Sequence, residues 1–234
     1  MKNEPFFVVG NWKSHKTVSE AADWMKELAF NLKKNPLETD AIKIILCPAA
    51  IHISTIKSLI SLYRLPLSLG LQDVSAYPSG AYTGQINADM AKDLVNYTLV
   101  GHSERRKYCA EQEPELKEKC VQAVAVGIEP IYCIQSETAV VPEGCKIVAY
   151  EPVWAIGTGK PDTGKNADRV AAAIKQKYAF VKTVIYGGSV TAENVAEYRK
   201  QANINGVLPG GASLSSATFY HLVKACTQHF LNAG

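Results

Sequence analysis

The chain has 234 residues, of which 47% are hydrophobic and 20% charged, and its formal net charge is +3. This composition supports a sizeable buried core and excludes an intrinsically disordered chain. The lysines are spread along the sequence, which indicates a solvated surface rather than a nucleic-acid interface. The length suits a single barrel-sized domain, which we predict to span 1–234.

No apolar segment near the start has the pattern of a signal peptide, and no run approaches the roughly 18 residues of a membrane span. The cysteines stand singly, without a CxxC pair, and are expected to be reduced thiols. They are Cys47, Cys109, Cys120, Cys133, Cys145 and Cys226. We therefore expect a cytoplasmic protein that binds neither nucleic acid nor membrane.

Short apolar runs alternate with amphipathic segments along the whole chain. The pattern predicts strands at 6–9, 42–46, 67–71, 97–100, 130–134, 147–150, 183–186 and 206–208. It predicts helices at 18–32, 54–63, 88–94, 114–126, 166–178, 192–201 and 215–231. The first of these helices opens with TVSE at 17–20, which is a capping-box pattern.

Strands that are separated by helices must run parallel, because parallel strands need long crossover connections. Two architectures remain open at this point: a closed barrel and an open, doubly wound sheet. No linker or low-complexity stretch divides the chain, so either architecture would form one domain.

One connection breaks the regular alternation. Residues 135–145 include Pro142 and Gly144 and are barely long enough for a crossover that contains a helix. We predict an irregular connection there, and therefore eight strands with only seven full outer helices.

Chemically useful side chains follow several of the predicted strands, which is where parallel α/β folds place catalytic groups. These positions hold an ammonium group at Lys13, an imidazole at His102 and a carboxylate at Glu151. Glycine-rich turns at 187–189 and 209–211 suit a phosphate, because glycine lets backbone N–H groups approach an anion. Each feature alone is also compatible with a structural role, and only their repetition after strands favours a site.

Five segments, in this order, resemble motifs of the triosephosphate isomerase family. They are GNWK at 10–13, VGHSERR at 100–106, AYEPVWAIGTGK at 149–160, YGGSV at 186–190 and GGASL at 210–214. The resemblance covers essentially the whole chain and implies a TIM (β/α)8 barrel. It also implies an aldose–ketose isomerase of glycolysis and gluconeogenesis, which interconverts dihydroxyacetone phosphate and glyceraldehyde 3-phosphate without cofactor or metal.

The same resemblance implies a role for each catalytic side chain. Glu151 is the base that moves a proton between neighbouring substrate carbons through an enediolate. His102 polarises the carbonyl oxygen as a neutral imidazole, and this family is itself an established example of such tuning. Lys13 and Asn11 offset the developing charge, and Glu104 positions Lys13. From the residues alone, Glu151 and Glu104 are also compatible with plain surface ion pairs.

Residues 152–160 resemble the loop that closes as a lid over the substrate phosphate in this family. The resemblance implies that Ile156 and Leu208 enclose the catalytic carboxylate when the lid shuts. The residues implied to bind the phosphate are Gly157, Ser189, Gly210 and Gly211, together with Asn11 and Lys13.

Several positions depart from the family pattern. Ser136 stands where a glutamate usually contacts the lid tryptophan, here Trp154. Pro161 lies at the far hinge of the lid, and Pro209 replaces a usual valine before the phosphate glycines. We expect these changes to alter lid kinetics and phosphate affinity and to leave the chemistry intact.

Residues 73–85 resemble the loop by which family members dock into a second subunit, so we expect a homodimer. Thr83 would reach the active site of the neighbouring subunit. Gln85 replaces a usual glutamate that pairs with an arginine of the partner, here Arg105, which leaves the strength of the dimer open.

Two other functions remain to be separated from this one. Another phosphate-binding barrel, such as a sugar-phosphate isomerase or a tryptophan-pathway enzyme, shares the glycine turns but does not explain the full set of charged residues. A catalytically silent scaffold is opposed by the intact Glu151 and His102. Turnover of glyceraldehyde 3-phosphate distinguishes these possibilities.

Overall fold

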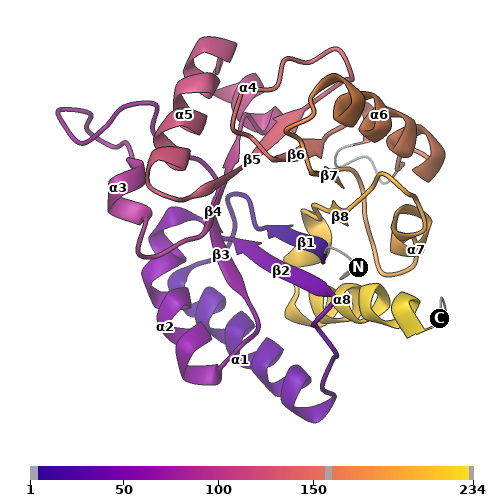
Figure 1. Ribbon diagram of the computed structural model, residues 1–234. Coiled ribbons are helices and arrows are strands. Elements are labelled where there is room, and N and C mark those ends of the chain that lie inside the picture. The colour runs from indigo at the N-terminus through magenta and orange to yellow at the C-terminus, as the bar shows by residue number, and fades with distance from the viewer. Residues whose placement is uncertain (1–4, 156–159, 232–234) are drawn as a thin grey trace.

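The computed structural model describes residues 5–155 and 160–231, and its eight parallel strands form a closed barrel (Figure 1). The strands are β1 Phe6–Asn11, β2 Ile42–Cys47, β3 Ser68–Leu71, β4 Tyr97–Val100, β5 Glu129–Ile134, β6 Ile147–Tyr150, β7 Thr183–Tyr186 and β8 Gly206–Val207. They follow one another around the barrel in chain order. The predicted strand positions are confirmed, with ends that differ by one or two residues.

The pairing of the first strand with the last decides between the two architectures. Phe7 lies opposite Gly206 in a parallel ladder between β1 and β8. A Cβ atom at Gly206 would lie 2.5 Å from the carbonyl oxygen of Phe7, so the close approach of the two strands requires glycine. The chain therefore forms a closed TIM barrel, as the resemblance implied.

Two apolar clusters follow from the alternation of side chains along each strand. The smaller cluster is made of side chains in or next to strands and fills the barrel interior; it includes Val9, Ile45, Leu99, Ile131 and Ile185. The larger cluster joins the outer faces of the strands to the helices that surround them. A rigid barrel of this kind fixes the positions of the loops at its ends.

The helices lie around the outside of the barrel (Figure 1). They are α1 Val18–Lys34, α2 Ile53–Tyr63, α3 Ala88–Ala91, α4 Ser103–Tyr108, α5 Glu113–Ala125, α6 Gly164–Lys177, α7 Val195–Arg199 and α8 Ser216–Leu231. Short 3-10 turns occur at Ala50–His52, Val153–Ala155 and Gly211–Ser213. None of the helices in the described part of the chain is long and apolar enough to cross a membrane.

The capping box predicted at the start of α1 is present. Glu20 Oε2 accepts a hydrogen bond from the backbone N–H of Thr17 at 2.7 Å, and Thr17 Oγ1 accepts one from the N–H of Glu20 at 3.3 Å. The cysteines are free thiols, and all except Cys109 are buried. Both features agree with the sequence-based predictions.

The connection between β5 and β6 contains no helix, which confirms the predicted irregular segment. Val141 and Cys145 of this segment are buried in the core. The Tyr178 hydroxyl of the neighbouring crossover donates a hydrogen bond to the carbonyl oxygen of Ala139 at 3.1 Å and anchors the segment. The segment and its buried apolar side chains thus cover the barrel wall where the other long crossovers place helices.

Two predicted helices are shorter than expected. The helix predicted at 88–94 is limited to α3, and the one predicted at 192–201 is limited to α7. The short helix α4 was not predicted. It begins inside the HSERR motif, directly after the cap residue His102. This unpredicted helix places His102 at the edge of the candidate site.

Candidate active site

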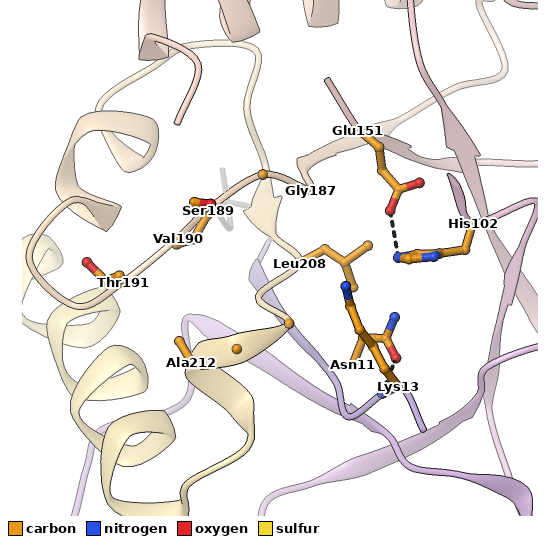
Figure 2. Close-up of a pocket in the computed structure, with 13 residues that line it drawn as sticks. Asn11, Lys13, His102, Glu151, Gly187, Ser189, Val190, Thr191, Leu208 and Ala212 are labelled. Carbon is orange, nitrogen blue, oxygen red and sulfur yellow. Dashed lines mark hydrogen bonds and ion pairs between the residues drawn. The ribbon is translucent and has the colours of Figure 1, made fainter. Parts of the chain in front are cut away.

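The residues that follow the strands converge on a cavity of about 280 Å³ (Figure 2). It is lined by Asn11, Lys13, His102, Glu151, Leu208 and Ala212, together with the glycine-rich turns Gly187, Gly188, Ser189, Val190, Thr191, Gly210 and Gly211. Because all eight strands are parallel, their carboxyl ends meet at one end of the barrel. Segments that lie far apart in sequence therefore contribute to one cavity.

Most of the predicted site residues thus face the same space. Glu104 does not line this cavity, but its carboxylate pairs with the ammonium group of Lys13, which does. Ile156 and Gly157 lie outside the described residues.

Glu151 directly follows β6 and is almost fully buried, with 1% of its side chain exposed. The alternative of a surface-paired carboxylate is therefore wrong. Its Oε2 accepts a hydrogen bond from the backbone N–H of Ser103 at 2.8 Å, and its Oε1 lies 2.9 Å from Nε2 of His102. The carboxylate is thus held at the wall of the cavity, next to the imidazole (Figure 2).

The hydrogen bonds of His102 define its tautomer. Its Nδ1 accepts a hydrogen bond from the backbone N–H of Glu104 at 3.2 Å, at the start of α4. A nitrogen that accepts carries no proton, so the neutral ring carries its proton on Nε2, and this N–H group donates a hydrogen bond to Oε1 of Glu151. This tautomer directs an N–H group toward the cavity.

Burial and charge act on His102 in opposite directions. Burial acts to lower the pKa of His102, but the carboxylates of Glu151 and Glu104 outweigh it, so the pKa is raised. The nearest carboxylate, that of Glu151, is the main source of this increase. Movement of Glu151 away from the ring would therefore favour the neutral imidazole, which the hydrogen bond at Nδ1 already supports.

Lys13 is held by contacts on three sides. Its backbone has a positive φ of 55°, and Asn11 Oδ1 accepts a hydrogen bond from its N–H at 2.9 Å. Gln72 Nε2 donates to its carbonyl oxygen at 2.8 Å, and its ammonium group lies 2.5 Å from Glu104 Oε1. A Cβ atom at Gly210 would lie 3.0 Å from Cε of Lys13, so glycine leaves room for the side chain.

The turn after β7 lies directly against the carboxylate. A Cβ atom at Gly187 would lie 2.9 Å from Cγ of Glu151, which is closer than real Cβ contacts. Two residues on, the Ser189 hydroxyl donates a hydrogen bond to the carbonyl oxygen of Ala155 at 2.8 Å. The turn is therefore packed against both ends of the segment 151–155.

Replacing Gly187 with alanine is expected to lower kcat by roughly 10- to 100-fold, because the added methyl group displaces the Glu151 carboxylate by several tenths of an ångström or more. Steady-state kinetics would measure the loss, and circular dichroism would check that the variant folds. An unchanged kcat in a folded variant would show that the position of Glu151 is not critical.

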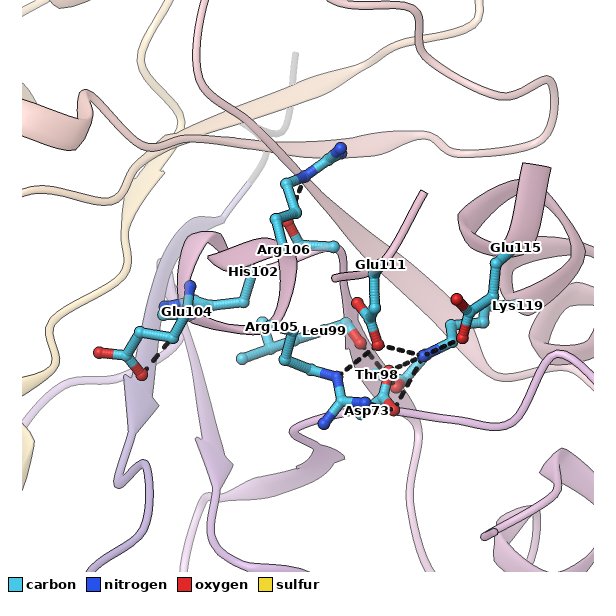
Figure 3. Close-up of polar contacts among 11 residues, drawn as sticks. Asp73, Thr98, Leu99, His102, Glu104, Arg105, Arg106, Glu111, Glu115 and Lys119 are labelled. Carbon is cyan, nitrogen blue, oxygen red and sulfur yellow. Dashed lines mark hydrogen bonds and ion pairs between the residues drawn. The ribbon is translucent and has the colours of Figure 1, made fainter. Parts of the chain in front are cut away.

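A cluster of buried and partly buried charges contacts α4 (Figure 3). Lys119 on α5 contacts Asp73 at 2.8 Å and also pairs with Glu111. Arg105 on α4 lies 2.8 Å from Asp73 Oδ2 and 2.6 Å from Glu111 Oε1. These ion pairs join the loop after β3, α4 and the start of α5 into one unit.

The charges in this cluster influence one another's protonation. Burial raises the pKa of Asp73, although Lys119 and Arg105 oppose the shift. Burial acts to lower the pKa of Lys119, but Asp73 and Glu111 outweigh it, and the pKa is raised. The surrounding carboxylates therefore favour the charged form of Lys119, although only 1% of its side chain is exposed.

Sequence reasoning missed two residues that organise the site. Gln72 directly follows β3 and donates hydrogen bonds to the carbonyl oxygens of Lys13 and Cys47. The rule that functional residues follow strands could have found it. The Ser213 hydroxyl contacts the carbonyl oxygens of Asn11 at 3.1 Å and Gly210 at 2.7 Å, and no local pattern marks that role.

The cavity at the carboxyl ends of the strands holds a carboxylate, an imidazole and an ammonium group. This arrangement places the protein in the class of TIM-barrel enzymes. A family model described as triosephosphate isomerase matches residues 6–147 and 143–226. The two matched segments meet where the short connection joins β6.

Relatives named triosephosphate isomerase align with nearly the whole chain. One from Mesomycoplasma hyopneumoniae (strain 7448) is 36% identical over 91% of this chain and 96% of its own length. One from Thermus thermophilus is 36% identical over 93% of this chain and 97% of its own length. One from Leifsonia xyli is 34% identical over 93% of this chain and 95% of its own length. The chain belongs to the triosephosphate isomerase family of intramolecular isomerases.

Proposed function

We propose that this protein interconverts dihydroxyacetone phosphate and D-glyceraldehyde 3-phosphate by proton transfer through an enediolate. The observation that carries the proposal is the convergence of Glu151, His102 and Lys13 on one cavity beside two glycine-rich turns. We further propose that the reaction serves glycolysis and gluconeogenesis in the cytoplasm.

Glu151 would act as the base, removing a proton from one substrate carbon and returning it to the neighbouring carbon. In the structure its carboxylate accepts hydrogen bonds from Ser103 and His102. In the reaction it would turn from His102 toward the substrate. The Nε2–H group of His102 would then be free to donate a hydrogen bond to the carbonyl oxygen and to the enediolate.

Lys13 and Asn11 would stabilise the negative charge of the enediolate and the phosphate. The short contact with Glu104 holds the Lys13 ammonium group near the cavity. The phosphate would lie against the glycine-rich turns, where Ser189, Gly210 and Gly211 line the cavity. Backbone N–H groups of such turns bind anions without requiring a large side-chain pocket.

The direct test is turnover of glyceraldehyde 3-phosphate by the purified protein in D₂O. Turnover is expected together with deuterium at the carbon next to the carbonyl group, because a proton held by a carboxylate exchanges with solvent. Turnover that leaves no deuterium at either carbon, together with undiminished turnover by Glu151→Gln, would contradict proton transfer through Glu151. Absence of turnover by the folded protein would favour a silent scaffold.

We also propose that the protein is a homodimer, joined through the loop at residues 73–85. Near the tip of this loop, Tyr77 and Tyr82 stack on each other with ring centroids 4.4 Å apart, and both are exposed. A second cavity of about 290 Å³ lies between the base of the loop and the segments that follow β1 and β2, next to Ser14 and Ala49. It would receive the loop of the partner.

Arg105 bears on the strength of this dimer. The family pattern suggests that it pairs with a partner glutamate, which Gln85 replaces here. In the structure Arg105 is already paired within its own chain, with Asp73 and Glu111. Loss of the partner's charge therefore does not leave the guanidinium group unpaired, and a dimer remains compatible with Gln85.

Light scattering at micromolar concentration is expected to give twice the chain mass of 25.4 kDa. Replacing Tyr82 with aspartate is expected to weaken the dimer by at least about tenfold, because it places a charge at an aromatic contact. Sedimentation at several protein concentrations would measure the change. A wild-type protein that is monomeric throughout this range would contradict the dimer.

A further inference from the structure

Lys16 has an unusual backbone conformation for a residue with a long side chain. Its φ is 78°, in the left-handed region that favours glycine. It lies between Lys13 and Thr17, the cap residue of α1. Such a conformation persists only where surrounding contacts hold it.

Three contacts hold Lys16 in place. Its ammonium group donates a hydrogen bond to the carbonyl oxygen of Leu214 at 2.5 Å, and it lies 5.1 Å from the ring centroid of Trp12. Its own carbonyl oxygen lies 3.0 Å from Nε2 of His52, which is completely buried. Both its backbone and its side chain are therefore tied to the interior.

The contact with Leu214 lies at the end of the turn that contains the phosphate glycines. Leu214 follows the 3-10 turn Gly211–Ser213, and its N–H donates to the carbonyl oxygen of Gly211 at 3.1 Å. The start of the same turn is also tied to the loop after β1, because the N–H of Asn11 donates to the carbonyl oxygen of Pro209 at 3.0 Å. Hydrogen bonds thus join the loop after β1 to both ends of residues 209–214. The one from Lys16 to Leu214 is charge-assisted, because its donor is an ammonium group.

We propose that Lys16 is a positioning residue, which fixes residues 209–214 against the loop that carries Lys13 and thereby sets the affinity for the substrate phosphate. It acts through Gly210 and Gly211 and does not itself line the cavity. This inference rests on the proposed function, because it assumes that the cavity binds a phosphate group.

Replacement of Lys16 by methionine tests the tie, because methionine keeps an apolar side chain over Trp12 and removes the charged donor. The affinity for inorganic phosphate, followed by ³¹P NMR titration, is expected to fall about five- to tenfold. The Michaelis constant should rise by a similar factor while kcat changes less than about twofold. Arginine at the same position retains a donor and a charge, and should restore most of the affinity.

Two further variants separate the tie from general effects. Lys57→Met removes an exposed lysine on α2 and should leave phosphate affinity unchanged. Lys16→Gly relieves the left-handed conformation and removes the tie, so it should fold and show the same weak affinity as Lys16→Met.

An unchanged phosphate affinity in Lys16→Met, or a fall in kcat without a change in the Michaelis constant, would overturn the positioning role. Failure of both Lys16→Met and Lys16→Gly to fold would also overturn it, because the role would then be structural. Phosphate binding is measured without turnover, so a silent but phosphate-binding protein would contradict the proposed function and leave this inference standing.

Discussion

Replacing Glu151 with glutamine is expected to lower kcat by about 10³- to 10⁴-fold, because an amide cannot accept the substrate proton. The substitution preserves the shape of the side chain and its acceptor for the N–H of Ser103. It also places an amide N–H₂ group opposite Nε2 of His102, which carries the ring proton when Nδ1 accepts from Glu104. The variant thus removes the base and disturbs its neighbour. Steady-state kinetics in both directions would measure the loss.

Glu104→Gln is the matched control for this prediction, because it makes the same chemical change at a carboxylate that contacts Lys13 rather than the cavity. A loss of roughly 10- to 100-fold is expected, as is usual when a supporting partner is removed. Phosphate titration should show that Glu151→Gln still binds the anion. If Glu151→Gln retained a tenth of the wild-type kcat, another group would have to be the base.

Replacing Lys119 with methionine is expected to lower the free energy of unfolding by about 3 kcal/mol, because it leaves buried carboxylate charge without its main partner. Glu111 and Lys119 are both 1% exposed, and Asp73 is 19% exposed (Figure 3). Arg105 remains close to both carboxylates and limits the loss. Within the described residues, Oε2 of Glu111 already lacks a hydrogen-bond partner, so the site has little capacity to compensate.

Urea unfolding at a fixed protein concentration would measure this loss, because the apparent stability of a dimer depends on concentration. Lys92→Met is the matched control, since it removes a lysine whose ion pair with Asp89 is exposed on both sides. Its unfolding midpoint is expected to stay at the wild-type value. Equal effects of the two substitutions would show that burial of the cluster does not determine its contribution.

Local pattern predicted the strands well but could not decide how they close. The runs at 42–46 and 183–186 have the apolar, β-branched composition of buried parallel strands. Closure depends on the pairing of Phe7 with Gly206, two residues nearly 200 positions apart, and that pairing leaves no trace in the periodicity of either segment. The family resemblance supplied what periodicity could not.

The candidate site was predictable where position along a strand determines it. Lys13, His102 and Glu151 each follow a strand end within two residues and were found by that rule. The role of Asn11 came from the family resemblance. Lys16 was not found, because its ammonium group contacts Leu214, which lies 198 residues further along the chain. Contacts of this kind become visible only when the barrel brings the two loops together.

The short connection between β5 and β6 also has a consequence for the order of folding. The entropy lost on closing a loop grows with the logarithm of its length. Residues 135–146 separate these two strands, whereas residues 151–182 separate β6 from β7. Closing the shorter loop costs roughly 1 kcal/mol less. The β5–β6 pair is therefore the parallel pair that the unfolded chain forms at least entropic cost, and the strands on either side can add to it as folding proceeds.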